Sequence, residues 1–430
     1  MADKNSNRVS QHAQLLALLD AFGEFGGTDK GGITRLAANA ADGGVRDYLC
    51  RWLKDHGCNV LVDQVGNIFG ILDLGDQFEE RYFFSGSHLD TQPEAGKFDG
   101  ALGVACACVA ALHLQECVKD NKLQPAFRYF VICCWTGEEG ARFQPSLVGS
   151  SVYSGARTAD ETLAISDASG INLKNALNAI GYLGNDTIPQ ADQYLELHIE
   201  QGTALESAKT PIGIVERCWG AKKLRIELQG VPDHTGPTPM EIRRNALLAA
   251  SHLVVSVEHL AQHSETTLYS SVGRMEIHPN SPNTIADHVE LWIEFRSPDE
   301  DTLAAAEKEL DQMLSQIEER TGCTSNVKSR ETRNVIEFDK AAISAIKDHF
   351  EKAFIPYLHL TTVAGHDAIR MQEVCPSTLL FVPSKDGITH SPAEYTSDED
   401  VCAGYDAMCE ALFQLIMIAS SGQKTRRISL

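Results

Sequence analysis

The stretch RYFFSGSHLDTQPEAGKFDGALGVACACVAALHLQECVKDNKLQPAFRYFVICCWTGEEG, residues 81–140, decides the fold class. It opens with the apolar run 81–90 and closes with the apolar run 127–140, and both runs are strand-like in composition and end in polar residues. Residues 100–120 lie between them and carry small apolar side chains at helical spacing, which predicts a buried crossover helix. A strand, a helix and a strand at this spacing predict parallel pairing in an α/β sheet, mixed but largely parallel, with helices on both faces.

Two later segments have the same pattern of an apolar run that ends in polar chemistry. They are YLELHIEQG (194–202) and TLLFVPSKDGITH (378–390). In α/β sheets, ligands bind beyond the carboxyl ends of the strands. All four segments deliver His, Asp or Glu at that end, so the sequence predicts a functional site along this edge of the sheet.

The middle of the chain follows a different pattern. From IGIVER (212–217) onward, short segments alternate apolar and polar residues, and two long helical segments separate them. This pattern is typical of an antiparallel sheet backed by helices on one face. We therefore predict an inserted ferredoxin-like α+β domain at 212–331, with the first domain formed by 1–211 and 332–430.

Composition limits the possible partners and the compartment. The 430 residues carry a formal net charge of −22, which disfavours nucleic acid and anionic membranes as partners. The N-terminus lacks the apolar core of a secretory signal, and no segment approaches about 18 uninterrupted apolar residues, so no membrane span is expected. Several of the twelve cysteines lie in apolar runs, which favours buried thiols in a reducing compartment and a cytoplasmic location.

Each candidate site residue has an ordinary interpretation when taken alone. Asp99 could cap a helix, Glu138 and Glu139 could lie in a solvated turn, His198 could be a core histidine and His390 a surface one. Jointly they favour a metal centre, because His88, Asp99, Glu139, His198 and His390 could hold two cations if Asp99 bridges them. Nitrogen and oxygen donors without thiolate suit Zn²⁺, Mn²⁺, Co²⁺ or Ni²⁺.

Two acidic neighbours of these residues suggest supporting roles. Glu138 precedes a candidate ligand and is itself left free, so it could accept a proton from water and pass it to a leaving nitrogen. Asp90 lies two residues after His88, on the same strand face, and could accept a hydrogen bond from the other ring nitrogen of that histidine.

Seven motifs, in this order along the chain, resemble those of a known enzyme group. They are GSHLDTQPEAGKFDGALG, WTGEEGARFQPSLVGSSVYSG, LELHIEQG, DHTGPTPM, PNSPNTI, AGHDA and THSPAEY. Together they resemble the dinuclear metallo-amidohydrolases of the aminoacylase and carboxypeptidase superfamily. The most similar branch contains the N-carbamoyl-L-amino acid hydrolases, β-ureidopropionases and allantoate amidohydrolases, and the resemblance runs from about residue 30 to about residue 415.

The resemblance implies a role for each matching residue. His88 and His198 would bind one metal, Glu139 and His390 the other, and Asp99 would bridge the two, with Glu138 as the catalytic base. The further positions that match the family are His234, which would polarise the scissile carbonyl, and the substrate contacts Asn283, Arg296, Gln201 and His366. A planar guanidinium suits a substrate carboxylate, although a salt bridge at the strand end is the ordinary interpretation of Arg296, as a helix-entry histidine is of His234.

The residues and the resemblance together predict a cytoplasmic, metal-dependent hydrolase. We expect it to cleave the ureido C–N bond of an N-carbamoyl-L-amino acid, releasing the amino acid, ammonia and carbon dioxide. Allantoate or ureidoglycolate amidohydrolase is the alternative, followed by an aminoacylase or dipeptidase, a cysteine-nucleophile amidase and a non-catalytic binding protein. Because His234, Asn283 and Arg296 lie in the inserted domain, we expect catalysis to require that this domain close over the metals. The resemblance implies that the same domain forms a homodimer. Two departures from the family, Ala95 and Asn245, fall outside the ligand set.

Overall fold

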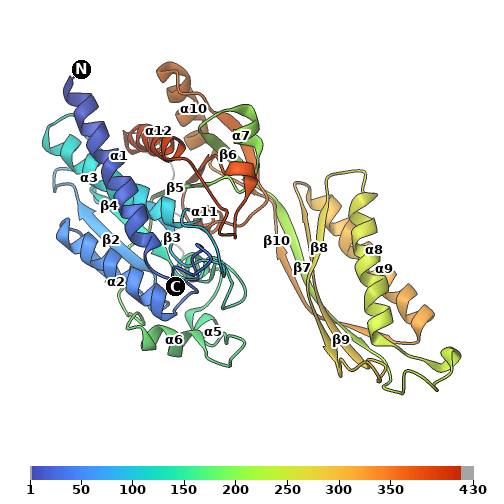
Figure 1. Ribbon diagram of the computed structural model, residues 1–430. Helices are drawn as coiled ribbons and strands as arrows, with labels where there is room; N and C mark the ends of the chain where they lie inside the picture. The colour runs from blue at the N-terminus through green and yellow to red at the C-terminus, as the bar shows by residue number, and fades with distance from the viewer. Residues whose placement is uncertain (1, 418–430) are drawn as a thin grey trace. The chain divides into compact units, whose positions relative to one another are not determined.

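The computed structural model describes residues 2–417, and the chain divides into two compact units. Unit 1 runs to Glu216 and includes Phe338–Leu360 and the chain from Gly365 onward. Unit 2 comprises Arg217–Glu337 and Thr361–Ala364. Figure 1 shows the two units and labels many of their helices and strands.

Unit 1 is built on a mixed sheet. Its strands, in spatial order, are β1 (Asn59–Val62), β2 (Ile68–Asp73), β4 (Tyr129–Trp135), β3 (Tyr82–His88), β5 (Gln193–Ile199), β13 (Ser377–Val382), β6 (Gly213–Cys218) and β11 (Ile336–Glu337), and β12 (Leu358–Thr362) also pairs with β6. The central strands β4, β3, β5 and β13 pair in parallel, whereas the outer pairs that flank them on both sides are antiparallel. These four parallel strands are the four segments that the sequence singled out, and the predicted mixed α/β sheet is confirmed.

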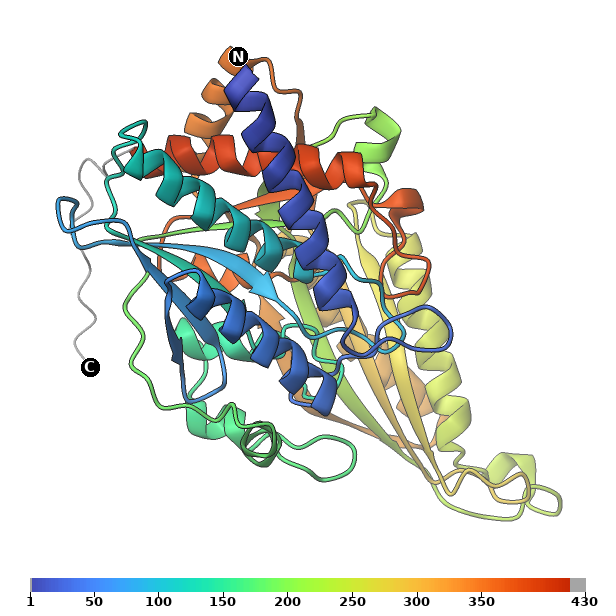
Figure 2. The same ribbon diagram turned by 60° about the vertical axis from the view of Figure 1, so that its left-hand side comes forward.

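Helices cover both faces of this sheet. Alternate residues of β5 show the two sides, because Leu197 faces α12 (Asp398–Met417) while the Glu196 carboxylate accepts a hydrogen bond from Ala368 of α11 (Asp367–Met371). Figure 2 shows the α12 side of the sheet, which α2 (Ala40–Asp55) and α3 (Ala101–Lys119) also cover, with α1 (Ala2–Gly23) outside them. The remaining helices of unit 1 are α4 (Val148–Tyr153), α5 (Ala159–Leu163), α6 (Leu173–Ala179), α7 (Ala204–Ala208) and α10 (Lys340–Ala353).

The crossover helix α3 lies where the sequence placed it, between β3 and β4. A side chain at Gly103 would come within 2.5 Å of the Leu197 carbonyl oxygen, so glycine allows α3 to pack closely on the sheet. With a mean hydropathy of 1.7, α3 is long and apolar enough to cross a membrane by length and composition, although Gln115 and Glu116 interrupt its apolar run. Because 67% of that window is buried within the protein, α3 is a core helix.

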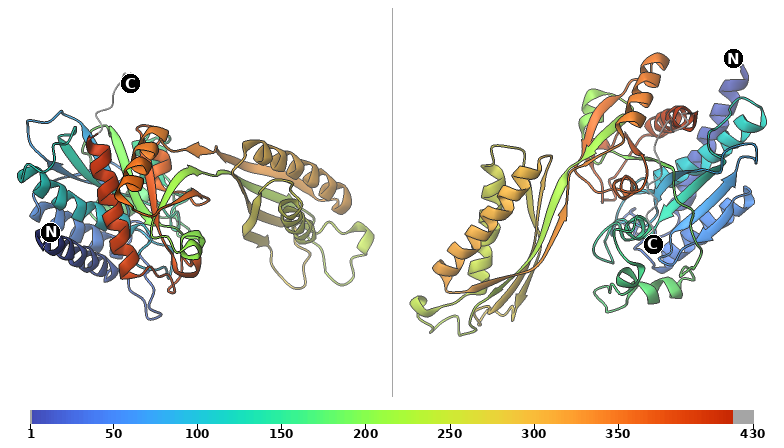
Figure 3. Two further views of the ribbon diagram at one scale, coloured as in Figure 1. Left: turned by 90° about the horizontal axis from the view of Figure 1, so that it is seen from above. Right: turned by 180° about the vertical axis from the view of Figure 1, so that it is seen from behind.

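Unit 2 contains an antiparallel sheet with both of its long helices on one face (Figure 3). Its elements follow the order β7 (Gly220–Gln229), α8 (Ala246–Gln262), β8 (Tyr269–His278), β9 (His288–Ser297), α9 (Glu300–Thr321) and β10 (Thr324–Arg333). The strand order β10-β7-β9-β8 and this βαββαβ sequence are those of a ferredoxin-like fold. Alternate strand residues such as Leu224, Ile226 and Leu228 are buried together with α8 and α9, as the alternating sequence pattern predicts.

The boundary of unit 2 differs from the proposed cut at 212–331. IGIVER was assigned to the inserted domain, but β6 continues the large sheet and pairs antiparallel with β13. The reason is visible in its burial: Ile212, Ile214 and Val215 are all completely buried, as expected for a strand covered on both faces. At the other end, β10 extends to Arg333, so the compact unit runs to Glu337.

A buried ion pair ties α2 to the turn after β4. The Arg46 Nε lies 2.8 Å from a carboxylate oxygen of Asp42, one turn earlier on α2, and both side chains are buried. The same guanidinium donates to the Gly66 carbonyl oxygen at 2.6 Å and to the Thr136 hydroxyl at 3.2 Å. Thr136 directly precedes the Gly137-Glu138-Glu139 segment. The Arg46–Asp42 pair therefore helps to fix the start of the turn that carries the two glutamates.

Replacing Arg46 with Ala should lower the free energy of unfolding by about 3–5 kcal/mol, because Asp42 would remain buried without its counter-charge. Urea denaturation of the metal-free protein, followed by far-UV circular dichroism, measures the change. Arg51→Ala is the matched control, since Arg51 is exposed on the same helix and its loss should change stability by no more than about 0.5 kcal/mol. Equal stabilities of the two variants would contradict the role given to the ion pair.

Candidate metal centre

The candidate site residues gather at the carboxyl ends of the parallel strands. His88 is the last residue of β3, and His198 is the penultimate residue of β5. Glu139 lies in the turn that follows β4, and His390 lies in the segment that follows β13. Because β4, β3, β5 and β13 are neighbours and run parallel, these residues share one edge of the sheet.

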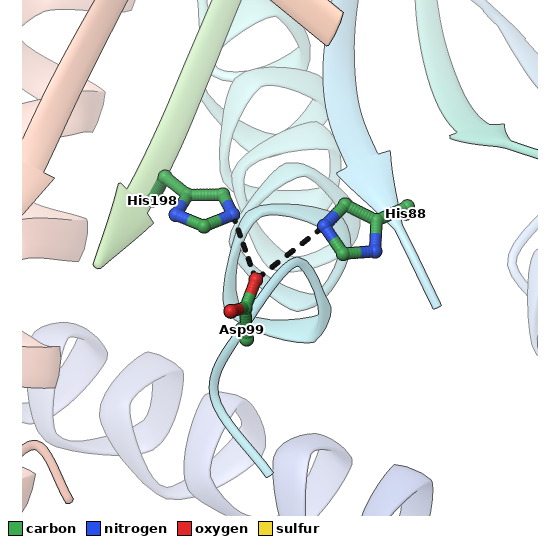
Figure 4. A group of neighbouring side chains, drawn as sticks. All are labelled: His88, Asp99 and His198. Atoms are coloured by element: carbon green, nitrogen blue, oxygen red, sulfur yellow. Dashed lines mark ion pairs between the residues drawn. The ribbon is translucent and has the colours of Figure 1, made fainter. Parts of the chain in front are cut away.

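Asp99 stands at the centre of this group. Its Oδ1 lies 3.5 Å from the His88 Nε2 and 3.2 Å from the His198 Nε2, as Figure 4 shows. Its Oδ2 lies 3.4 Å from the His390 Nε2, which is also 3.2 Å from a carboxylate oxygen of Glu139. The five residues therefore form two clusters of possible ligands, one on each oxygen of Asp99.

The donor atoms fit a divalent metal. The His88 Nε2 is completely buried and has no hydrogen-bond partner in the described part of the chain, an arrangement that is costly unless a ligand satisfies that nitrogen. Each cluster places its donor atoms within 4.8 Å of one another and contains only imidazole and carboxylate groups. This is the donor set that zinc and similar transition metals accept.

The charges of the site stabilise positive charge. Burial alone would raise the pKa of Asp99, but the adjacent imidazoles of His198, His390 and His88 lower it well below its usual range. Hydrogen bonds to Asp99 and Glu139 raise the pKa of His390 to about 10. Burial alone would lower the pKa of His88, but the nearby carboxylates, Glu138 foremost, raise it well above its usual value. A cation would replace this positive charge on the imidazoles.

Glu138 lies beside the cluster around His88. Its Oε2 is 3.7 Å from the His88 Nε2, and its side chain is mostly buried. Burial raises the pKa of Glu138 well above its usual value, and the charges of Asp367 and Glu139 add to this effect. A carboxylate with a raised pKa is a stronger proton acceptor than an ordinary one, which suits a general base.

Asp90 supports the site differently from the sequence-based expectation. The His88 Nδ1 lies 2.9 Å from the backbone carbonyl oxygen of Asp90 but 3.8 Å from its carboxylate. The carboxylate instead accepts hydrogen bonds from the backbone amides of Glu138 at 3.2 Å and Glu139 at 3.3 Å. Burial raises the pKa of Asp90 to about 6, and these two amides provide the donors that a buried carboxylate requires. Asp90 thus orients both glutamates.

Gln201 contacts the site through Asp99. Its Nε2 donates to the Asp99 Oδ2 at 2.8 Å, and its backbone has the left-handed φ of 57°. His390 has a similar φ of 53°. For residues other than glycine this conformation is strained, and such strain is concentrated at functional sites.

Glu394 is a site residue that the analysis of single motifs missed. Its carboxylate accepts the backbone amides of Phe98 at 3.0 Å and Asp99 at 3.1 Å, and the Thr389 hydroxyl at 3.1 Å. The Thr389 hydroxyl also lies 2.9 Å from the Asp99 Oδ2. Glu394 therefore connects the segment of Asp99 to that of His390. Its place inside THSPAEY, four residues after a candidate ligand, was the available signal.

Two further buried side chains, those of His366 and Glu196, lie close to His198. The His366 ring is buried, and its centroid is 4.5 Å from that of His198. The Glu196 carboxylate accepts hydrogen bonds from the hydroxyls of Ser87 at 2.7 Å and Tyr194 at 3.0 Å. His366, predicted as a substrate contact, thus packs against a candidate ligand.

The three remaining predicted residues lie in unit 2. The segment of His234 pairs with that of Asn283. His234 and Thr284 form an isolated antiparallel β-bridge, and the Thr235 amide donates to the Asn283 carbonyl oxygen at 3.2 Å. The Arg296 guanidinium donates to the Val363 carbonyl oxygen at 2.8 Å and lies 3.0 Å from the Glu294 carboxylate. The salt bridge considered as the ordinary interpretation of Arg296 is thus present.

The two departures from the family motifs fit the structure. Asn245 caps α8, since its side-chain oxygen accepts the amides of Leu247 and Leu248. Ala95 is buried and exchanges two backbone hydrogen bonds with Ile33.

Comparison with known proteins gives concordant relatives. An N-carbamoyl-L-amino-acid amidohydrolase of Rhizobium meliloti is 32% identical over 96% of this chain and 99% of its own length. The allantoate amidohydrolase of Escherichia coli K12 is 28% identical over 91% of this chain and 95% of its own. A crystal structure of an amidase of the hydantoinase/carbamoylase family from Burkholderia vietnamiensis matches with a TM-score of 0.87 at 32% identity, covering 95% of this chain and 98% of that one.

The model of the peptidase family M20/M25/M40 matches residues 84–414, which include Asp99, the four candidate ligands around it and the whole of unit 2. The fold, the cluster of donor atoms and the relatives therefore agree: the chain belongs to the peptidase family M20/M25/M40 and is a hydrolase of carbon–nitrogen bonds.

Proposed function

We propose that the chain hydrolyses the carbamoyl C–N bond of an N-carbamoyl-L-amino acid, with either α or β spacing, to the amino acid, ammonia and carbon dioxide. The observation that carries the proposal is the pair of ligand clusters that share Asp99, with the buried Glu138 beside them. The relative from Rhizobium meliloti, which matches nearly the whole chain, is named for this reaction.

Two divalent ions, Zn²⁺, Mn²⁺, Co²⁺ or Ni²⁺, would be held by His88 and His198 on one side and by Glu139 and His390 on the other, with Asp99 shared. When bound, such ions polarise a carbonyl group and lower the pKa of water. Glu138 would take a proton from the attacking water and deliver it to the leaving nitrogen. Asp90 would keep Glu138 and Glu139 in place through its bonds to their amides.

We assign substrate recognition to five residues. His234 would donate a hydrogen bond to the oxyanion that develops on the carbamoyl carbon. Asn283 and Arg296 would bind the substrate carboxylate, for which the planar guanidinium of Arg296 is suited, in exchange for its pairing with Glu294. Gln201 and His366 would contact the substrate near Asp99 and His198.

A substrate panel on protein reconstituted separately with Mn²⁺, Zn²⁺, Co²⁺ and Ni²⁺ tests the proposal. We expect turnover of N-carbamoyl-L-amino acids or N-carbamoyl-β-alanine in excess of allantoate and ureidoglycolate, and loss of turnover after chelation. Preference for allantoate would instead favour the activity for which the Escherichia coli relative is named. Fully metallated protein that cleaves no ureido substrate would overturn the proposal.

Thiol reagents should leave the activity unchanged. The twelve cysteines all lie in the described part of the chain and form no disulfide there. Burial raises the pKa of Cys133 and raises that of Cys134 to about 12, so these thiols are poor nucleophiles. Free thiols in this number also support a reducing, cytoplasmic location. Inactivation by a thiol reagent with metal retained would instead support the cysteine-nucleophile alternative.

We further propose a homodimer formed through unit 2. Leu248 and Val255 lie on one face of α8, seven residues apart, and are 47% and 54% exposed. Sedimentation velocity should show a dimer, and L248D/V255D should shift it toward the monomer because apolar contact would be lost. Lys308→Asp, an exposed charge change on α9, is the control. If the parent protein sediments as a monomer at micromolar concentration, the proposed homodimer through unit 2 is wrong.

A further inference from the structure

The ring of His234 is held by its own turn. The Gly236 amide donates a hydrogen bond to the His234 Nδ1 at 2.9 Å. The Thr238 hydroxyl donates to the His234 carbonyl oxygen at 2.7 Å. Both contacts are made within five residues, so the orientation of the imidazole depends on the shape of the segment 234–238.

The contact with Gly236 selects one tautomer of the neutral imidazole. Because an amide N–H can only donate, the His234 Nδ1 must accept and the ring proton must reside on Nε2. The Nε2–H is then the donor left for another group. A hydrogen bond to a developing oxyanion requires this donor, whereas the opposite tautomer would present a lone pair.

Arg243 closes the same turn from outside. Its Nε donates to the Thr238 carbonyl oxygen at 2.9 Å, and its Nη2 donates to the carbonyl oxygens of Thr235 at 2.7 Å and Thr238 at 2.8 Å. The planar fork of the guanidinium thus holds both ends of the turn at once, through charge-assisted hydrogen bonds.

The backbone around Arg243 is held in place by further hydrogen bonds. Arg243 lies two residues before Asn245, whose side chain caps α8, and the carbonyl oxygen of the intervening Arg244 accepts the Val231 amide at 2.9 Å. On the other side of the turn, the Ile285 amide donates to the Asp233 carbonyl oxygen at 2.7 Å. The turn is therefore held between the start of α8 and the segment of Asn283.

We infer that Arg243 is a positioning residue for the proposed hydrolysis, because it holds the 234–238 turn in the shape that keeps the Nε2–H of His234 available to the oxyanion. This role rests on the proposed function. Among the described residues, the hydrogen bonds of the Arg243 guanidinium go to backbone carbonyl oxygens of the turn, so its effect should pass through His234 to the transition state.

The kinetic test compares two adjacent arginines. Arg243→Ala should lower kcat by about 100-fold with little change in KM, since a small misplacement of a group that binds the transition state has an effect of this order. Arg243→Lys should recover only part of the rate, because an ammonium group cannot reproduce the fork. Arg244→Ala is the matched control: Arg244 is exposed, and its side chain lies toward Gly322.

A second readout does not depend on activity. Protein labelled with ¹⁵N in histidine, with the His234 signals assigned by His234→Ala, should show the Nε2-protonated tautomer in the parent at about pH 8.5, where an ordinary imidazole is neutral. In Arg243→Ala the two ring nitrogens should move toward averaged shifts. If Arg243→Ala fails to fold, Thr238→Val, which removes the other side-chain donor to the turn, takes its place.

The two experiments separate this inference from the proposed function. Unchanged His234 signals and an unchanged kcat in Arg243→Ala, relative to Arg244→Ala, would overturn the positioning role. If the parent hydrolyses no ureido substrate, the proposed function fails, whereas the ¹⁵N signals still report whether Arg243 controls the His234 ring. A fall in kcat restored in part by Lys, together with altered His234 signals, supports the inference.

Discussion

Replacing Glu138 with Gln is expected to lower kcat by about 10²–10⁴-fold, the range that general acid–base catalysis contributes. Gln has nearly the shape of Glu but cannot take the proton of the attacking water. Glu138 is well placed for that step, because its Oε2 lies 3.7 Å from the His88 Nε2 and burial raises its pKa. Steady-state kinetics on the best substrate of the panel measure the loss.

The metal content distinguishes a lost base from a lost metal. Glu138 is not among the five candidate metal ligands, so the variant should retain the parent's metal when analysed by inductively coupled plasma mass spectrometry. Glu80→Gln, an exposed glutamate outside the site, is the control. A kcat within about threefold of the parent, with full metal, would remove Glu138 from the role of base.

Replacing Asp99 with Ala should have the second large effect, the loss of both metals and of all metal-dependent turnover. The Oδ1 of Asp99 belongs to the cluster of His88 and His198, and its Oδ2 to the cluster of Glu139 and His390. A single substitution thus takes one donor from each cluster. Without metal, the pKa of the attacking water would no longer be lowered toward neutrality.

His390→Ala should affect only one of the two clusters. The His390 side chain is 45% exposed, whereas those of His88 and His198 are 1% and 2% exposed. We therefore expect His390→Ala to retain about one metal per chain after gel filtration, the parent two and Asp99→Ala none. Asp120→Ala, which alters an exposed ion pair, serves as the control. Retention of the parent's metal by Asp99→Ala would show that this carboxylate is not shared.

Much of the site could be predicted because it depends on local order along the chain. His88 ends one apolar strand and Glu139 follows another, and the carboxyl ends of parallel strands are where ligands bind. The ferredoxin-like unit was likewise visible, since alternation along β7 and β9 is a local property of the sequence. The resemblance to known motifs supplied the remaining site residues, including His234 and Arg296.

Long-range pairing determined what the sequence could not. IGIVER has the composition of a strand in either unit, and only its register against β13 assigns it to the large sheet. From the sequence, the Asp90 carboxylate could accept a hydrogen bond from His88. In the folded chain it instead accepts hydrogen bonds from two backbone amides of the turn after β4, a choice that depends on the tertiary structure.

The sequence by itself determined which side chains end the parallel strands, because hydrophobic periodicity and strand ends are properties of neighbouring residues. Only the tertiary structure decided that β4, β3, β5 and β13 lie side by side. As a result, Asp99 lies next to the imidazoles of His198 and His390, which are far from it along the chain. The physical reason is that strand order depends on the packing of the whole core. Which strands pair is decided by the arrangement in which all the strands and helices together bury their apolar side chains.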